Sequence, residues 1–274
     1  MADDRAVVRA DAIIVAAGRS SRMDGTDKLG AEIGGRPLLA WTLAAVAAAP
    51  EIDRLVVVTS EERRKGIAGA PWLPDPVVDV VVGGERRQES VLAGFLAFDR
   101  LGVDEGAPVL VHDGARPLVR AELISAVVAA TARHGAAIPV LPMAETLKRI
   151  DGEWVGGTLD RTGLGTAQTP QGVRRGLLRD AYRRFPANAP EIWTDEAALL
   201  EACGVAVHVV PGDPDNLKVT VPGDLRRAGA ALAGPSAIRT GIGHDSHPFG
   251  PGVPLALGGV EIDGAPRLHG HSDG

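Results

Sequence analysis

Short apolar runs alternate with longer segments of helical periodicity through most of this 274-residue chain. The apolar runs are rich in Val and Ile, which is typical of strands buried on both faces. They comprise residues 13–15, 55–59, 77–82, 109–112 and 137–141. The helical segments between them comprise residues 38–49, 61–67, 89–101 and 122–134. Alternation of this kind predicts an α/β fold with a mostly parallel sheet covered by helices on both faces.

The alternation breaks at residues 146–168, which mix glycine, charged and isolated apolar residues. A two-stranded excursion with a tight turn at Asp151-Gly152 fits this stretch. An isolated ribbon is only marginally stable, so it should lean on something else, such as a second subunit. Further helices and strands are predicted after it. The helices are expected at 174–184, 194–202 and 222–233, and the strands at 205–210 and 217–220.

Residues 228–236 are rich in alanine, glycine and proline, and beyond them Gly, His, Asp and Pro replace the helical patterns. This change of texture indicates a boundary between a large domain, residues 1–234, and a short second segment, residues 235–274. The first is long enough to bury a substantial core, whereas the second cannot bury much apolar surface by itself.

The formal net charge of -6 argues against a general nucleic-acid-binding protein, and local basic loops in an acidic chain favour a small anionic substrate. No apolar run approaches the roughly 20 residues that span a bilayer. The first residues also lack the basic-then-apolar layout of a signal peptide. The single cysteine, Cys203, cannot form an internal disulfide and is interpreted as a small packed side chain. We therefore expect a cytoplasmic protein with no membrane or nucleic-acid partner.

The first apolar run ends in Ala16-Ala17-Gly18, and Arg22 and Lys28 follow shortly after it. Small residues let the backbone approach a ligand, and fixed positive charge beside backbone N–H groups suits a polyanion such as a nucleoside triphosphate. The loop matches neither the dinucleotide fingerprint nor the Gly-Lys-Ser/Thr phosphate loop. Taken alone, it is equally compatible with a surface turn that carries solvated arginines.

Two later strand ends carry polar residues as well: Gly83-Gly84 before a helix, and His112-Asp113 with Arg116 close behind. Ligands of doubly wound sheets bind at the carboxyl ends of the strands. Each feature has an ordinary structural interpretation, such as a strand-to-helix turn or a surface ion pair. For Asp195, helix capping is the better interpretation. Jointly, charged residues at successive strand ends indicate one site.

Six motifs occur here in a fixed order. They are Ala-Ala-Gly-x-x-x-Arg-Met with a later Lys, Gly-Gly-x-x-Arg-x-x-Ser-Val, Val-His-Asp-Gly-Ala-Arg-Pro, Thr-Pro-Gln, Thr-Asp-Glu-Ala and Asp-Asn-Leu-Lys-Val-Thr. Over roughly residues 10–230, the set resembles the 2-C-methyl-D-erythritol 4-phosphate cytidylyltransferases of non-mevalonate isoprenoid synthesis. The resemblance implies a Rossmann-like nucleotidyltransferase with a protruding β-arm at 146–168, through which a homodimer forms and completes the partner's site.

The resemblance also implies the reaction: CTP and 2-C-methyl-D-erythritol 4-phosphate (methylerythritol phosphate) give the CDP-linked alcohol and pyrophosphate, with Mg²⁺. The residues implied in catalysis are Arg22, Lys28, Asp113 and Lys218. The implied CTP contacts are Ala16, Ala17, Gly18, Gly84, Glu85 and Ser90, with Arg22 and Lys28 on the triphosphate. The implied contacts to methylerythritol phosphate are Asp113, Arg116, Thr146, Arg161, Thr169, Thr194, Asp215 and Lys218.

Two positions depart from the family pattern, which usually has Gly where Ser20 stands and often Asp where Glu85 stands. Two other functions remain open from the sequence. One is a related sugar-phosphate nucleotidyltransferase that uses UTP or GTP. The other is a catalytically silent nucleotide-binding module. Four intact residues argue against it: Arg22, Lys28, Asp113 and Lys218.

The second segment carries Asp245-Ser246-His247, and Asp-x-His places two good Zn²⁺ ligands on one side of an extended chain. With His271-Ser272 further on, the segment resembles the opening of 2-C-methyl-D-erythritol 2,4-cyclodiphosphate synthase. By that resemblance, Asp245 and His247 are zinc ligands, whereas His271 and Ser272 contact substrate. Only two zinc ligands are identified, whereas a catalytic zinc site normally needs three, and so short a segment cannot bury much core. We therefore expect this segment to be poorly ordered and inactive alone. The resemblance implies that it belongs to a bifunctional fusion with lyase activity.

Overall fold

The structure is a computed structural model that describes residues 8–18, 27–102, 104–233, 247–257 and 260–269. Contacts divide the chain into two units, Met1–Gly234 and Pro235–Gly274. The first unit carries the sheet and the candidate site. Among the described residues, no helix is long and apolar enough to cross a membrane.

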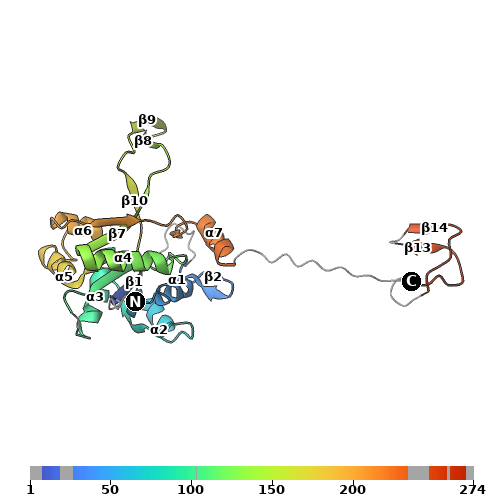
Figure 1. Ribbon diagram of the computed structural model, residues 1–274, viewed down its shortest axis with the longest axis horizontal. Coiled ribbons are helices and arrows are strands. Elements are labelled where there is room, and N and C mark those ends of the chain that lie inside the picture. Colours follow the sequence, from blue (N-terminus) through green and yellow to red (C-terminus); the bar gives the residue numbers. More distant parts are fainter. Residues whose placement is uncertain (1–7, 19–26, 103, 234–246, 258–259, 270–274) are drawn as a thin grey trace, which may run out of the picture. The chain divides into compact units, whose positions relative to one another are not determined.

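The described residues of the first unit form an eight-stranded sheet with the order β10-β7-β11-β6-β1-β4-β5, and β12 pairs with β7 (Figure 1). β1, β4, β5 and β6 pair in parallel, as does β12 with β7. The strands are β1 (Ala10–Ala16), β4 (Ile52–Thr59), β5 (Val77–Val82), β6 (Pro108–Asp113), β7 (Ala136–Pro142), β10 (Gly165–Ala167), β11 (Gln171–Arg174) and β12 (His208–Pro211). The mostly parallel α/β fold predicted from the sequence is confirmed.

The exceptions are β10 and β11, which both run antiparallel to β7, and β11 also runs antiparallel to β6. Ala137 pairs with both Gly172 and His208, so β11 and β12 lie on opposite sides of β7. This insertion of β11 between two parallel strands was not predicted. It brings the turn before β11, with Thr169, beside the end of β6.

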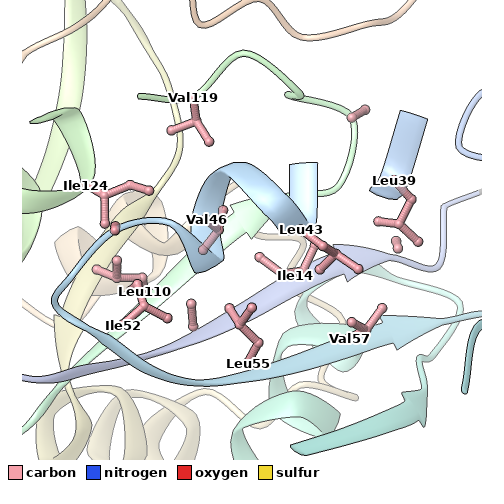
Figure 2. Packing of buried hydrophobic residues seen from close by; sticks show 14 of the residues in the cluster. Ile14, Leu39, Leu43, Val46, Ile52, Leu55, Val57, Leu110, Val119 and Ile124 are labelled. Atoms are coloured by element: carbon pink, nitrogen blue, oxygen red, sulfur yellow. The ribbon is translucent and has the colours of Figure 1, made fainter. Parts of the chain in front are cut away.

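Helices cover both faces of the sheet because neighbouring apolar residues of each strand point to opposite faces. Ile14 and Leu110 belong to one core with Leu43 of α1 and Ile124 of α4 (Figure 2). Ile13 belongs to the second core, with residues of α3, α5 and α6. The helices are α1 (Leu38–Ala47), α2 (Glu61–Ala68), α3 (Arg87–Asp99), α4 (Ala121–His134), α5 (Arg175–Arg184), α6 (Glu196–Ala202) and α7 (Pro222–Ala233).

Strands β8 (Leu147–Asp151) and β9 (Trp154–Leu159) form an antiparallel hairpin that projects from the sheet (Figure 1). Its turn contains Gly152 with φ +57°, a conformation that favours glycine. The predicted excursion with an Asp-Gly turn is thus confirmed. Every residue of β9 is exposed.

The strand predicted at 217–220 is wrong, because these residues form no ladder. Val219 is nevertheless buried, and its backbone N–H donates to Ala115 O at 2.8 Å. The strand predicted at 205–210 begins only at His208. A short hairpin, β2 (Glu32–Ile33) with β3 (Arg36–Pro37), was not predicted.

The capping interpretation of Asp195 is confirmed, since its carboxylate accepts from Ala198 N–H at the start of α6. In the second unit, β13 (Leu255–Leu257) pairs antiparallel with β14 (Val260–Ile262). The part of this unit that the structure describes contains no helix, as expected from its composition.

Candidate active site

A pocket of about 780 Å³ opens at the carboxyl ends of the neighbouring strands β6, β1, β4 and β5. It joins most of the residues predicted to bind nucleotide with two of those predicted to hold methylerythritol phosphate. The predicted residues that line it are Ala16, Ala17, Gly18, Lys28, Gly84, Glu85, Ser90, Asp113 and Lys218. Residues far apart in the sequence therefore form one site at the edge where α/β sheets bind ligands.

The first wall of the pocket is the end of β1 and the chain around Lys28. Arg63 of α2 donates to Ala16 O at 3.0 Å and pairs with the Asp27 carboxylate at 3.2 Å. The Lys28 ammonium donates to Val219 O at 3.2 Å. Two of the positions predicted here, Ser20 and Arg22, lie outside the described residues.

The second wall is the loop from β5 into α3. Gly83 is packed so tightly that an added Cβ would lie 2.5 Å from Ser90 Oγ and 2.7 Å from the Ala17 Cβ. Only glycine allows this approach between the two loops. Ser90 is buried, and its hydroxyl contacts Gly84 O and Arg86 O at 3.4 and 3.3 Å, whereas Glu85 is exposed.

The floor of the pocket is a cluster of charges around Asp113, the last residue of β6. Its Oδ2 lies 2.8 Å from Lys218 Nζ and 3.5 Å from Arg116 Nε, and its Oδ1 lies 4.0 Å from Arg87 Nε. Burial alone would raise the pKa of the Asp113 carboxyl, but the charges of Lys218, Arg87 and Arg116 outweigh it and hold this pKa far below its usual range. Asp113 is therefore an ionised hydrogen-bond acceptor near neutral pH.

Thr169 supports this carboxylate from behind. Its hydroxyl accepts from Asp113 N–H at 3.1 Å and lies 3.0 Å from His112 Nδ1, while Asn216 donates to Thr169 O at 2.8 Å. Thr169 is buried and does not line the pocket. Arg116, also buried, donates to Asn216 O at 2.7 Å. These bonds fix the backbone that carries Asp113 and Lys218.

His112 is fully enclosed next to Asp113. Burial lowers its pKa to about 4, although the charge of Asp113 acts in the opposite direction. A neutral imidazole fits its two contacts: Nδ1 accepts from the Thr169 hydroxyl, and Nε2–H donates to Arg116 O at 3.4 Å. His112 is thus a neutral support near pH 7.

Besides Arg116 and Thr169, four of the residues predicted to contact methylerythritol phosphate lie outside the lining of the pocket. Thr146 and Arg161 flank the arm hairpin and are exposed, and Arg161 donates to Ala144 O. Thr194 is exposed immediately before the cap residue of α6. Asp215 is exposed and forms an ion pair with Arg120. Within one chain, the structure does not bring these four to Lys28.

Two residues without an assigned role complete the cluster, Arg87 and Glu196. Arg87 lines the pocket, and its two terminal nitrogens donate hydrogen bonds to the Glu196 carboxylate at 2.6 and 2.9 Å. The sequence contained a signal for both, because Arg87 lies in Gly-Gly-x-x-Arg and Glu196 in Thr-Asp-Glu-Ala. That the two side chains meet could not be predicted from either motif.

Possible metal ligands are sparse. Among the described residues there is no group of three or more His, Cys, Asp or Glu side chains that could hold a metal ion. Exposed carboxylates of Glu61, Glu62 and Glu85 do line the pocket. Of the tail residues singled out in the sequence, His247 is described, whereas Asp245, His271 and Ser272 lie outside the described residues.

The 2-C-methyl-D-erythritol 4-phosphate cytidylyltransferase family matches residues 10–234, which include the whole pocket. This chain belongs to that family. It is therefore an enzyme, a nucleotidyltransferase that transfers the cytidylyl group of CTP to methylerythritol phosphate in isoprenoid synthesis. The YgbB family matches residues 238–274, which lie in the second unit. Members of the two families use divalent metal ions.

Curated relatives carry both parts. The chain is 44% identical to a bifunctional enzyme IspD/IspF of Rhodospirillum rubrum over 263 residues, which covers 96% of this chain and 67% of the relative. It is also 44% identical to the enzyme of that name from Anaeromyxobacter dehalogenans, covering 95% of this chain and 66% of the relative. The chain thus spans about two thirds of the length of these bifunctional relatives.

Solved structures agree with the family. The chain resembles the 2-C-methyl-D-erythritol 4-phosphate cytidylyltransferase of Thermus thermophilus with a TM-score of 0.67 and 35% identity, over 82% of this chain and 99% of the other. It resembles the bifunctional IspDF of Campylobacter jejuni with a TM-score of 0.65 and 25% identity, over 97% of this chain and 66% of the other. The cytidylyltransferase fold is therefore shown for the first unit.

Proposed function

We propose that the pocket at the ends of β1, β5 and β6 binds CTP and methylerythritol phosphate side by side, so that the phosphate of the alcohol reaches the α-phosphorus of CTP. One observation carries this proposal: the Lys218–Asp113 pair lies in the same pocket as Lys28 and the Gly83-Gly84 loop. Two anions can approach one another there because fixed cations stand on both sides.

The nucleotide half is assigned to the first two walls. Their small residues and the tight Gly83 turn let the backbone approach the cytidine, and Lys28 with Arg22 holds the triphosphate. The residues assigned to the cytidine are Ala16, Ala17, Gly18, Gly84, Glu85 and Ser90.

The acceptor half is assigned to the charge cluster. Asp113, held ionised by its three cations, accepts a hydrogen bond from a hydroxyl of methylerythritol phosphate. Lys218 keeps donors for the phosphate, because an ammonium has three and Asp113 takes one of them. Arg116 fixes the loop that carries Lys218. Thr169 acts from behind Asp113, and Thr194 and Asp215, exposed and outside the lining of the pocket, are assigned to further contacts with the acceptor.

In the reaction, a phosphate oxygen of methylerythritol phosphate forms a bond to the α-phosphorus of CTP. The bond from that phosphorus to the oxygen bridging the β-phosphate breaks, and pyrophosphate leaves with both electrons of that bond. The attacking oxygen is already ionised near neutral pH, so no general base is required. Holding the two substrates in line makes the attack effectively unimolecular, and the cations stabilise the charge that moves to the leaving group.

We assign Mg²⁺ as the divalent metal ion that binds with the nucleotide. Mg²⁺ prefers oxygen ligands and is usually bound by one or two carboxylates together with substrate phosphates. The exposed carboxylates of Glu61, Glu62 and Glu85 fit that donor set. When bound, the ion would offset part of the negative charge on the triphosphate.

Arg161 and Thr146 are assigned to the pocket of a second subunit. They flank an exposed hairpin with apolar side chains, and an isolated hairpin is marginally stable. A homodimer in which the arm crosses to the partner would cover these side chains and bring Arg161 to the acceptor phosphate.

We assign residues 1–234 to the cytidylyltransferase domain and residues 235–274 to a linker and the start of a cyclodiphosphate synthase domain. The match at 238–274 and the bifunctional relatives support this division. In the whole protein, Asp245 and His247 would be two ligands of a Zn²⁺ ion, since carboxylate and imidazole are zinc ligands, and His271 and Ser272 would contact substrate. The whole protein would then have lyase activity as well.

The test is pyrophosphate release from CTP, UTP, GTP and ATP, each with methylerythritol phosphate and Mg²⁺. Release with CTP alone, dependent on methylerythritol phosphate, is expected. Release with a different nucleotide would assign the pocket to another sugar-phosphate nucleotidyltransferase activity. CTP binding without release would indicate a silent nucleotide-binding module.

A further inference from the structure

Consecutive residues at the start of α3 hold the segment 187–196, which runs from α5 into α6. Arg86 donates to Ala187 O at 2.6 Å and to Ala189 O at 2.5 Å. The Gln88 amide donates to Ala187 O at 3.0 Å and accepts from Trp193 N–H at 2.9 Å. Because Arg86 and Gln88 lie within four residues of Gly84, these hydrogen bonds tie the Gly83-Gly84 loop of the nucleotide wall to the segment 187–196.

Arg87 lies between these two clamps and binds the end of the same segment. Its two terminal nitrogens donate to the two oxygens of Glu196 at 2.6 and 2.9 Å, a fork-to-fork pair. Glu196 is only 2% exposed, and its backbone N–H donates to Gln171 Oε1 at 3.0 Å. The guanidinium is therefore fixed in position and orientation, which a lysine at this place could not reproduce.

The fixed guanidinium makes its shortest approach to Asp113 at a different oxygen from the other two cations. The shortest distances of Lys218 and Arg116 are to Oδ2, at 2.8 and 3.5 Å, whereas that of Arg87 runs from Nε to Oδ1, at 4.0 Å. At 4.0 Å the interaction is electrostatic and leaves the lone pairs of Oδ1 for another donor. Three cations thus set the orientation of the Asp113 carboxylate, and one of them belongs to the nucleotide wall.

We propose that Arg87 is a positioning residue that connects the nucleotide wall to Asp113, so that the acceptor alcohol is bound in the attacking orientation. This inference rests on the proposed function, because it assumes that Asp113 receives a hydroxyl of methylerythritol phosphate. Arg87 touches neither reacting atom; it acts by holding the carboxylate that does the orienting. Its effect falls on the acceptor and on the coupling between the two substrates.

The experiment compares Arg87→Lys and Arg87→Met with the wild-type chain by steady-state pyrophosphate release. We expect kcat/KM for methylerythritol phosphate to fall about tenfold or more in both variants, because small errors of orientation are costly in a bound pair of reactants. KM for CTP should change by less than about threefold, since the nucleotide wall keeps its other contacts. Glu196→Gln, which retains Arg87, should show a smaller loss for the acceptor.

Arg179→Met is the matched control. Arg179 also forms a two-pronged pair with a carboxylate, Asp99, at 2.9 and 3.0 Å, but it does not line the nucleotide pocket. We expect it to lose stability as Arg87→Met does, with both KM values unchanged. An Arg87→Met enzyme whose two KM values and kcat equal those of Arg179→Met would overturn the inference.

A second readout avoids turnover. Binding of methylerythritol phosphate is measured by calorimetry with and without a CTP analogue whose α,β bridge is a methylene group. In the wild type the analogue should tighten acceptor binding, and in Arg87→Met this gain should vanish. Equal gains in both proteins would refute the coupling. If the wild type released no pyrophosphate with any nucleotide, the proposed function would fail; an active wild type matched by Arg87→Met would sink only this inference.

Discussion

Lys218 Nζ lies 2.8 Å from Oδ2 of Asp113, although Asp113 ends β6 and Lys218 lies in the loop between β12 and α7. The two partners differ in exposure: the Asp113 side chain is 11% exposed and that of Lys218 is 41% exposed. The pair therefore presents the Lys218 ammonium to the pocket and keeps the Asp113 carboxylate more deeply buried. This arrangement suits a site that binds a phosphate next to a hydroxyl.

Replacing Lys218 tests whether its ammonium binds the acceptor phosphate. Lys218→Met should lower kcat/KM for methylerythritol phosphate by about 10²-fold, the cost of removing one preorganised electrostatic donor. The pKa of Asp113 should rise, because Lys218 is the largest of the charges that lower it. Pyrophosphate release measures the first effect and carboxyl NMR titration the second. Arg183→Gln, which removes an exposed ion pair with Asp180, is the control and should leave both unchanged.

The pH dependence of Asp113 follows from the direction of its shift. Its pKa is lowered on folding, so its stabilising contribution is present above the unfolded value of about 4 and is lost only as the pH falls below it. Between pH 5.5 and 8, the rate of pyrophosphate release should show no ionisation of Asp113. An acidic limb in that range that Asp113→Asn abolished would contradict this assignment.

Gly83 tests the contact between the two nucleotide loops. In Gly83→Ala the new Cβ would lie 2.5 Å from Ser90 Oγ and 2.7 Å from Ala17 Cβ, so one loop must move. We expect KM for CTP to rise about tenfold or more and stability to fall by about 1–3 kcal/mol, as for overpacking elsewhere.

Gly66→Ala is the control for this change. Gly66 lies within α2, and its added Cβ would have no neighbour within 4 Å. The variant should be as stable as the wild type or more stable by about 0.5–1 kcal/mol, because alanine favours helix. Unchanged CTP kinetics in both variants would remove Gly83 from the nucleotide wall.

The buried, neutral state of His112 leads us to expect that the protein loses stability in mild acid. Its pKa is about 4 when folded, lowered by burial, against about 6.5 when unfolded. Between these values the unfolded chain binds more protons, so stability falls as the pH falls. From pH 7 to pH 5 the contribution is about 2 kcal/mol. Urea unfolding at the two pH values measures it, and His112→Asn should show a correspondingly smaller difference. Equal differences in the two proteins would refute the buried neutral imidazole.

The sheet could be predicted because its strands are apolar on both sides. Ile13 and Ile14 are adjacent and enter different cores, a simple consequence of period-two geometry. β11 could not, because Gln171 and Gly172 form no apolar run. Gln171 is nevertheless buried, because its polar amide has hydrogen-bond partners. The amide oxygen accepts from Glu196 N–H, and the amide nitrogen donates to the Asp195 carboxylate.

The candidate site could be predicted in part for the same kind of reason. Strand ends are visible in a sequence, and they located Gly84 and Asp113. Contacts across elements are not visible, so the pairing of Arg87 with Glu196 came only with the structure. The strand predicted wrongly at 217–220 has a related cause. Alternating apolar residues indicate that side chains are buried, but Val219 is buried in a loop whose backbone bonds to Ala115 and not in a strand.

The arm hairpin leaves large apolar side chains exposed, with Ile150 at 65%, Trp154 at 79% and Val155 at 64%. Arg161 is exposed at its base and lies outside the pocket of its own chain. If the arm serves the partner's pocket, Arg161 and Lys28 of one chain work in different sites. This separation can be measured by mixing variants.

Lys28→Ala and Arg161→Ala should each be nearly inactive alone. For Lys28→Ala the rate of pyrophosphate release should fall by about 10²-fold. Subunits mixed at equal amounts and allowed to exchange should regain about a quarter of wild-type activity, because half of the dimers are mixed and each mixed dimer has one intact site. Mixing Lys28→Ala with Asp113→Asn is the control. Those two residues line one pocket of the same chain, so every site keeps a defect and no activity should return. No recovery with Arg161→Ala would show that the arm does not act across the dimer, and recovery in the control would show that Lys28 and Asp113 do not serve one site.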